Sequence, residues 1–252
     1  MGTSPEWSYN MEALARTKPT PEELAKRQEE KNLSDFKSQF RNAILGIPEK
    51  FRWVDQHIQP NPKSRLSLDE QAKLYAEIND RTKRLEGWAF FSPAGFGKTT
   101  ASWLLYKWAI RQNLYHAIWT GQQEWVVRDA PRTTPYFYDC YCWHIVLPEY
   151  LAQIQASWTD DSVARPKMIF DKFEKAKTQG FTPRLFIEEL DKVKEGSEWA
   201  NNILFTLFNA VDKHKAQLVF DTNLSRQQFM NRFGEPIYRR AKENCNMREW
   251  GF

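Results

Sequence analysis

An α/β fold with a largely parallel sheet is the fold class that the sequence predicts, and three observations support it. Short apolar runs typical of buried strands alternate with longer segments whose apolar residues recur at helical spacing. A glycine-rich stretch joins one such run to a helical segment, and polar residues directly follow two more runs. Because the carboxyl ends of parallel strands share one edge of a sheet, where ligands bind, these polar residues predict the functional site.

Composition narrows the class of protein. The 252 residues suit one large domain, or one domain with an appendage, and the 41% of hydrophobic residues suffices for a buried core. A formal net charge of +4 permits contact with nucleic acid without requiring it. The sparse set Cys140, Cys142 and Cys245 fits a reducing compartment rather than a disulfide framework. No apolar run reaches the roughly 18 residues of a membrane span, and no secretory signal is seen. We therefore expect a cytoplasmic address and no membrane partner.

Residues 1–45 are expected to form a helical arm that binds a protein partner. Thr20, Pro21 and Glu23 have the pattern of a capping box at the start of a helix. Basic and acidic side chains balance over residues 1–50, with eight of each, so a protein is a better partner than phosphates. One apolar stripe recurs at helical spacing: Leu33, Phe36, Phe40 and Ile44. Whether the stripe binds that partner or packs on the chain's own core stays open.

The remaining elements follow in order from pattern and turn residues. The residues at 46–48 end the first helix, and a second capping box, Ser67 with Glu70, starts a helix that reaches about Arg84. Further strands are expected at 88–91, 141–146, 184–187 and 218–220, and further helices after residue 100, at 148–157, at 165–178 and at 197–214. Residues after 223 are expected to be mostly helical, and residues 113–139 to be an irregular, aromatic-rich insertion.

A phosphate-binding loop follows the strand at 88–91. The sequence S-P-A-G-F-G-K-T matches G-x-x-x-x-G-K-[ST] except that Ser92 replaces the leading glycine. The glycines let main-chain amides turn inward around an anion, Lys98 reaches the β- and γ-phosphates, and the Thr99 hydroxyl ligates Mg²⁺. The expected cofactors are therefore ATP and Mg²⁺. The residues expected to bind them are Pro93, Ala94, Gly95, Phe96, Gly97, Lys98, Thr99 and Thr100.

Acidic and amide side chains after two later strands complete the expected site. Glu188 is the second metal residue, one methylene longer than the aspartate usual at this place, and Glu189 is the general base for the attacking water. Asp191 is a reserve carboxylate or a surface charge. Asn223 would orient the lytic water beside the γ-phosphate. Taken alone, each is more typical of a solvated strand end or turn, and the order of the motifs along the chain favours the functional interpretation.

These segments resemble the DnaC/DnaI/IstB branch of the AAA+ ATPases. The resemblance covers roughly residues 44–250 and includes GIPEKFRWV at 46–54, the nucleotide loop, RLFIEELDKV at 184–193 and DTNLSRQQFMNRFGEPIYRRA at 221–241. It implies a three-layer α/β/α ATPase domain over 46–252 with the lid absent or minimal. It also implies ATP-dependent self-association into an open ring or spiral that holds DNA. By the same match Arg240 is the arginine finger, whereas an arginine pair such as Arg239 and Arg240 is ordinarily a solvated helix face.

Three functions are compatible with these features. The first is a helicase loader that grips single-stranded DNA, the DNA form we favour over duplex, and binds a replicative helicase. The second is an IstB-like regulator that assembles on duplex DNA and recruits a transposase. The third is a nucleotide-sensing adaptor with little turnover, which Ser92 and Glu188 favour because both depart from the family pattern. The aromatic and basic residues of 113–139 either stack bases or pack as a hairpin on the domain; they include Trp119, Trp125, Tyr136, Phe137, Tyr138, Arg128 and Arg132.

Overall fold

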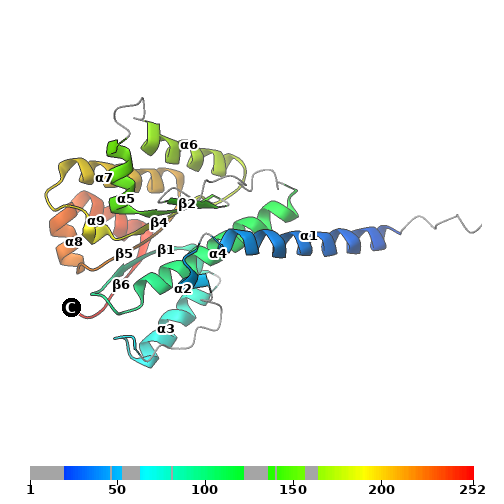
Figure 1. The fold of residues 1–252 in the computed structure, drawn as a ribbon, viewed down its shortest axis with the longest axis horizontal. Coiled ribbons are helices and arrows are strands. Elements are labelled where there is room, and N and C mark those ends of the chain that lie inside the picture. The colour runs from blue at the N-terminus through cyan, green and yellow to red at the C-terminus, as the bar shows by residue number, and fades with distance from the viewer. Residues whose placement is uncertain are drawn as a thin grey trace, which may run out of the picture.

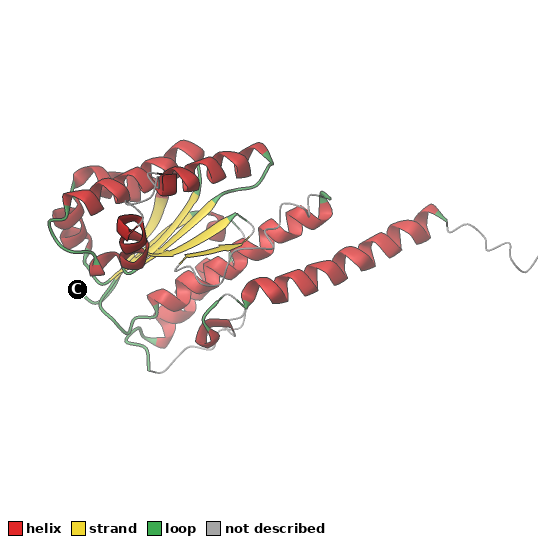
Figure 2. Ribbon diagram, turned by 45° about the horizontal axis from the view of Figure 1, so that its top comes forward, coloured by secondary structure: helices red, strands yellow, loops and turns green. Residues whose placement is uncertain are grey.

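A six-stranded sheet between two layers of helices forms the body of the protein (Figures 1 and 2). The structure is a computed structural model and describes residues 20–45, 47–52, 63–80, 82–121, 136–139, 141–156 and 164–252. The strands are β1 (Gly87–Phe91), β2 (Tyr136–Asp139), β3 (Cys142–Val146), β4 (Arg184–Glu188), β5 (Gln217–Thr222) and β6 (Cys245–Glu249). The helices are α1 (Pro21–Ile44), α2 (Glu49–Arg52), α3 (Leu68–Asn79), α4 (Lys98–Trp119), α5 (Leu147–Ala156), α6 (Ala164–Thr178), α7 (Glu198–His214), α8 (Arg226–Phe233) and α9 (Glu235–Asn244).

The strand order is β2-β3-β4-β5-β1-β6, and every neighbouring pair is parallel except β2 with β3. The order places β1, which leads into the glycine-rich loop, between β5 and β6. It also sets the carboxyl ends of β4 and β5 beside the end of β1. The predicted fold class is thereby confirmed: the chain has a three-layer α/β/α domain with a mostly parallel sheet, in the P-loop AAA+ arrangement.

Alternating side chains along the strands fill two separate cores. On β1, Trp88 and Phe90 face α4, α3 and the end of α1, whereas Ala89 and Phe91 face the layer of α5 to α9. All of β1 is buried because helices cover both faces, which is why its sequence reads as an unbroken apolar run. The rigid sheet therefore holds the loop after Phe91 in place.

The first helix begins where its capping box predicts. The Glu23 amide donates to the Thr20 hydroxyl at 3.1 Å, and the Thr20 amide donates to the Glu23 carboxylate at 2.9 Å. Phe36 and Phe40 pack against the core beneath α4, and the Phe36 ring lies 6.3 Å from that of Trp119. The C-terminal part of the stripe thus covers the chain's own core. The N-terminal half of α1 extends away from the body (Figure 1). The boundary between residues 45 and 46 stays a prediction.

Two expectations about secondary structure need correction. The helix after Ser67 ends at Asn79 rather than Arg84, because the Asp80 carboxylate accepts from the Thr82 amide and hydroxyl and turns the chain into a short 3₁₀ turn. The described residues of 113–139 are largely regular rather than irregular, since α4 continues to Trp119 and 136–139 is a strand. The residues after 223 are mostly helical as expected, in α8 and α9, and they are followed by the strand β6, which pairs with β1. Trp125, Arg128 and Arg132 lie outside the described residues.

The strand β6 could not be predicted from the sequence, because its residues, CNMRE, contain no apolar run. Its side chains are only partly buried at the edge of the sheet, so pairing with β1 rather than burial makes it a strand. Within the part of the chain that the structure describes, no helix has the length and apolarity that crossing a membrane requires.

Candidate nucleotide site

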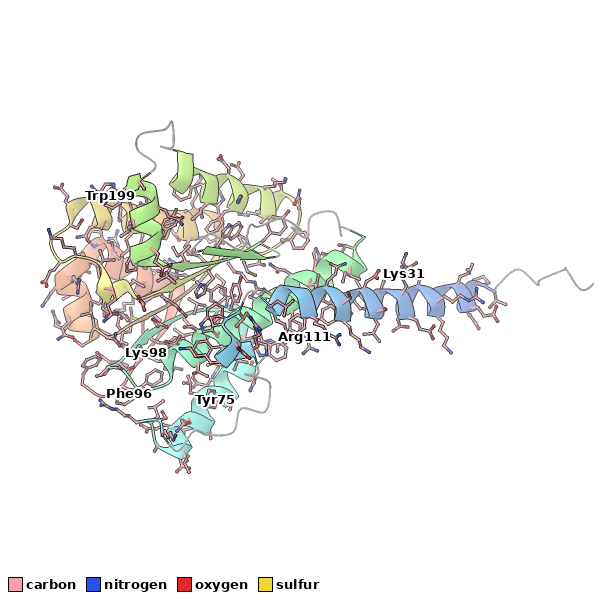
Figure 3. The ribbon with its side chains drawn as sticks, viewed as in Figure 1. Lys31, Tyr75, Phe96, Lys98, Arg111 and Trp199 are labelled. Carbon is pink, nitrogen blue, oxygen red and sulfur yellow. The ribbon has the colours of Figure 1, made fainter. Side chains whose placement is uncertain are left out.

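The glycine-rich loop runs from Ser92 to Gly97 between β1 and α4. Gly95 and Gly97 have φ angles of 94° and 85°, in the left-handed region that favours glycine. Ser92 has no positive φ and is fully buried, so the serine occupies the place of the motif's first glycine without backbone strain. Figure 3 shows Phe96 on this loop and Lys98 at the amino end of α4. Unpaired amides at that end of the helix attract an anion.

The Lys98 ammonium is held at the carboxyl edge of the sheet, and the residue is only 7% exposed. Its Nζ donates to the carbonyl oxygens of Ser92 at 2.8 Å and Pro93 at 3.1 Å, and to Asn223 Oδ1 at 2.8 Å. Burial lowers the pKa of Lys98, and the nearby Asp221 and Asp191 carboxylates act in the opposite direction. Phosphate oxygens are stronger acceptors for this cation than carbonyls, so the present partners are ones that a nucleotide would displace.

Asn223 is oriented by Asp191, a carboxylate for which the sequence predicts only a reserve role. Asp191 accepts the Asn223 main-chain amide at 3.0 Å and its side-chain Nδ2 at 2.9 Å. Both nitrogens of Asn223 are therefore directed to Asp191, and Oδ1 is left to face Lys98. The sequence signal for Asp191 was its spacing of two residues from Glu189, which by itself does not identify a partner.

Asp221 is a further acidic residue at the site, and sequence reasoning did not select it. It is 5% exposed on β5, and it accepts hydrogen bonds from the Thr99 hydroxyl and the Glu189 amide. Burial, followed by the Glu188 charge, raises its pKa to about 7, against the opposing effects of Lys98 and the two hydrogen bonds. Among the described residues no hydrogen-bond donor meets its Oδ2. An aspartate inside the apolar run of β5 was the available signal.

The oxygen atoms around Thr99 fit a hard divalent cation such as Mg²⁺. The Thr99 hydroxyl, the buried Asp221 carboxylate and Glu188, whose side chain is 14% exposed, lie on the α4 side of the sheet ends. No group of three His, Cys, Asp or Glu side chains in the described residues would hold a metal ion by itself. In proteins that act on phosphates, Mg²⁺ is commonly bound through one or two carboxylates together with the substrate phosphates.

Glu189 is the site residue whose conformation differs most from the one predicted for a general base. Its φ of 60° is left-handed, it begins the 3₁₀ turn Leu190–Lys192, and its side chain is exposed. The amide of this residue, rather than its carboxylate, is directed at Asp221. A non-glycine residue in this conformation is uncommon and is often found at functional sites.

The arginine pair on α9 divides into an inward and an outward residue. Arg240 Nη1 lies 3.2 Å from Asp212 Oδ2 of α7, and its guanidinium carbon lies 5.6 Å from the centre of the Phe205 ring. The Arg239 side chain is 64% exposed and lies near Glu243 one turn along the same helix. The proposed finger, Arg240, is therefore engaged within its own chain.

The strand order, together with the position of this loop between β1 and α4, gives the chain the P-loop AAA+ fold. No family model matches the sequence, and no curated protein matches it. Similar solved structures include AMPPCP-bound DnaA from Aquifex aeolicus, at 9% identity and a TM-score of 0.48, covering 78% of this chain and 51% of that one. They also include the DnaC helicase loader, at 14% identity and a TM-score of 0.47, covering 79% of this chain and 98% of that one. This chain thus spans about half of the DnaA structure.

Proposed function

We propose that the protein binds Mg-ATP at the loop 92–99 and hydrolyses it. The observation that supports this most is the placement of Lys98, which directly follows the left-handed Gly97 and is held among acceptors at the sheet edge, next to Asp221 and Asn223. An isolated buried ammonium is costly, and such a group is retained where an anionic ligand compensates it. When bound, Mg²⁺ neutralises charge that develops on the phosphates.

Each residue of the site then has a defined role in binding or hydrolysis. Amides of residues 93–99 cradle the phosphates, and Lys98 leaves the Ser92 and Pro93 carbonyls to bind the β- and γ-phosphates. Thr99 and Glu188 face the metal. Asn223, already oriented by Asp191, holds the lytic water. Glu189 accepts the proton of that water, which requires its side chain to turn from solvent toward the site.

We further propose that ATP binding drives assembly on DNA, with a helicase loader as the leading role. The support is the sequence resemblance over residues 44–250. ATPase rates with no DNA, single-stranded DNA and duplex DNA test the role directly. Stimulation by single strands and association with a replicative helicase support the loader, whereas preference for duplex DNA and binding of a transposase supports the transposition regulator. An ATPase rate that neither form of DNA changes would contradict both the loader and the transposition-regulator roles.

Glu189→Gln separates the ATPase from a nucleotide-sensing adaptor. Besides Ser92 and Glu188, the structure adds one observation that favours the adaptor, the exposure of Glu189. We expect the substitution to lower turnover about 100-fold with little change in ATP affinity, because it removes only the general base. Phosphate release and equilibrium binding measure the two quantities, with Glu195→Gln, another exposed glutamate, as the matched control. Equal and negligible phosphate release by the wild type and both variants would instead support the adaptor.

Arg240 is proposed to act on the nucleotide of a neighbouring subunit, which requires it to leave Asp212. Arg240→Ala is then expected to bind ATP but not hydrolyse it, because the transition-state charge lacks its cation. Mixing it with Lys98→Ala subunits is expected to restore turnover, since each supplies what the other lacks. The exposed Arg239 is the competing finger. Arg239→Ala subunits that lose turnover while Arg240→Ala subunits keep it would transfer the role to Arg239.

A further inference from the structure

A buried histidine stands beside the metal-facing side of the site. His144, on β3, is 1% exposed. Its ring stacks on Trp103 of α4, with centroids 4.1 Å apart and an angle of 24° between the planes, and it meets Tyr106 edge-on at 5.6 Å. Two aromatic residues of the helix that follows the phosphate loop thus define where the imidazole lies.

The imidazole contacts Glu188 on the neighbouring strand. His144 Nε2 lies 3.3 Å from Glu188 Oε1. Because β3 and β4 pair His144 with Phe186, Glu188 is the diagonal neighbour of His144 on the same face. Diagonal neighbours lie about 7–8 Å apart, a gap that only long side chains bridge. Glutamate spans this gap, whereas aspartate, one methylene shorter, would fall short.

We propose that His144 is a positioning residue that holds the Glu188 carboxylate toward the metal of the bound nucleotide. The inference rests on the proposed Mg-ATP site. Glutamate has one more rotatable bond than aspartate, and a carboxylate free to rotate loses entropy when it binds a metal's water shell. The His144 contact with Oε1 restricts that rotation and leaves Oε2 for the metal. Partners that orient metal ligands in this way typically contribute 10- to 100-fold in metal affinity.

A double-mutant cycle on binding tests the proposal without relying on turnover. The four proteins are the wild type, His144→Phe, Glu188→Asp and the double variant. Phenylalanine keeps a flat ring for Trp103 to stack on and removes both ring nitrogens. Affinity for the non-hydrolysable analogue AMPPNP is measured with Mg²⁺ and with EDTA, and Mn²⁺ binding in the presence of AMPPNP is measured by electron paramagnetic resonance.

The proposal predicts coupling that depends on the metal. His144→Phe is expected to weaken Mg²⁺-supported binding about tenfold, to leave binding in EDTA unchanged, and to have no further effect once Glu188 is aspartate. His214→Phe, a buried histidine of α7 that packs on Phe173, is the matched control and should not change either affinity. Thermal unfolding of each protein confirms that it is folded.

Several results would overturn the inference. An equal loss from His144→Phe in both backgrounds, or an equal loss with and without Mg²⁺, would make His144 a packing residue only. If His144→Phe does not fold, Glu188→Asp decides by itself: Mg²⁺ and Mn²⁺ binding as tight as in the wild type would show that the contact contributes nothing. Failure of the wild type to bind AMPPNP at all would instead overturn the nucleotide site, and with it this inference.

Discussion

Lys98→Ala is expected to abolish ATP binding at concentrations that saturate the wild type. Hydrogen bonds to a charged group contribute about 1.5–3 kcal/mol each, and the ammonium would make two or more to phosphates. Losing these hydrogen bonds raises the dissociation constant for ATP by a factor of about 100 or more. Isothermal titration with ATP and with AMPPNP measures the loss, and circular dichroism confirms that the variant is folded.

A matched lysine shows whether the effect belongs to the loop. Lys192 is an exposed cation 3.9 Å from Asp191, so it lies near the site without belonging to the phosphate loop. Lys192→Ala should bind ATP within about twofold of the wild type, because exposed ion pairs contribute little. Wild-type affinity in Lys98→Ala would refute the assignment of the loop, and a comparable loss in both variants would reduce it to a general charge effect.

Phe229→Ala is expected to cause the largest loss of stability among single substitutions in the α5 to α9 layer. Phe229 of α8 is fully buried, and its ring lies 5.5 Å from both Phe91 and Phe220 and 4.9 Å from Phe233. Truncating such a ring costs about 3–5 kcal/mol through lost burial and the cavity left behind. Since whole domains have only about 5–15 kcal/mol of stability, denaturant unfolding should shift strongly to lower concentration.

Phe229→Ala is also expected to affect the proposed nucleotide site. Phe91 immediately precedes Ser92, so a cavity beside it loosens the end of β1 from which the phosphate loop starts. Phe252→Ala is the control, because that side chain is 59% exposed and should change the free energy of unfolding by less than about 0.5 kcal/mol. A loss below about 1 kcal/mol in Phe229→Ala would mean that the aromatic cluster repacks.

Features whose causes are local in the chain could be predicted from the sequence. The strand, loop and helix around Gly95, Gly97 and Lys98 are contiguous, and the backbone conformations that the glycines require are properties of those residues themselves. The capping boxes at Thr20 and Ser67 span four residues each and form as predicted. Periodicity over single segments was likewise enough for the α/β class.

Features that depend on which strands are neighbours were decided only by the tertiary structure. His144, Glu188 and Asp221 are far apart in the chain and come together on the α4 face of the sheet because β3, β4 and β5 are adjacent. β6 is a strand because β1 offers it a pairing edge, not because of its own residues.

Packing alone can also give two adjacent residues of the same type different surroundings. Arg239 and Arg240 are chemically identical neighbours, yet Asp212 and Phe205 of α7 hold just one of them. By itself, the sequence therefore determined the class of fold and the position of the loop that we propose to bind a triphosphate. The tertiary structure decided which carboxylates, amide and imidazole surround that loop, because sheet order and register join residues that no local pattern connects.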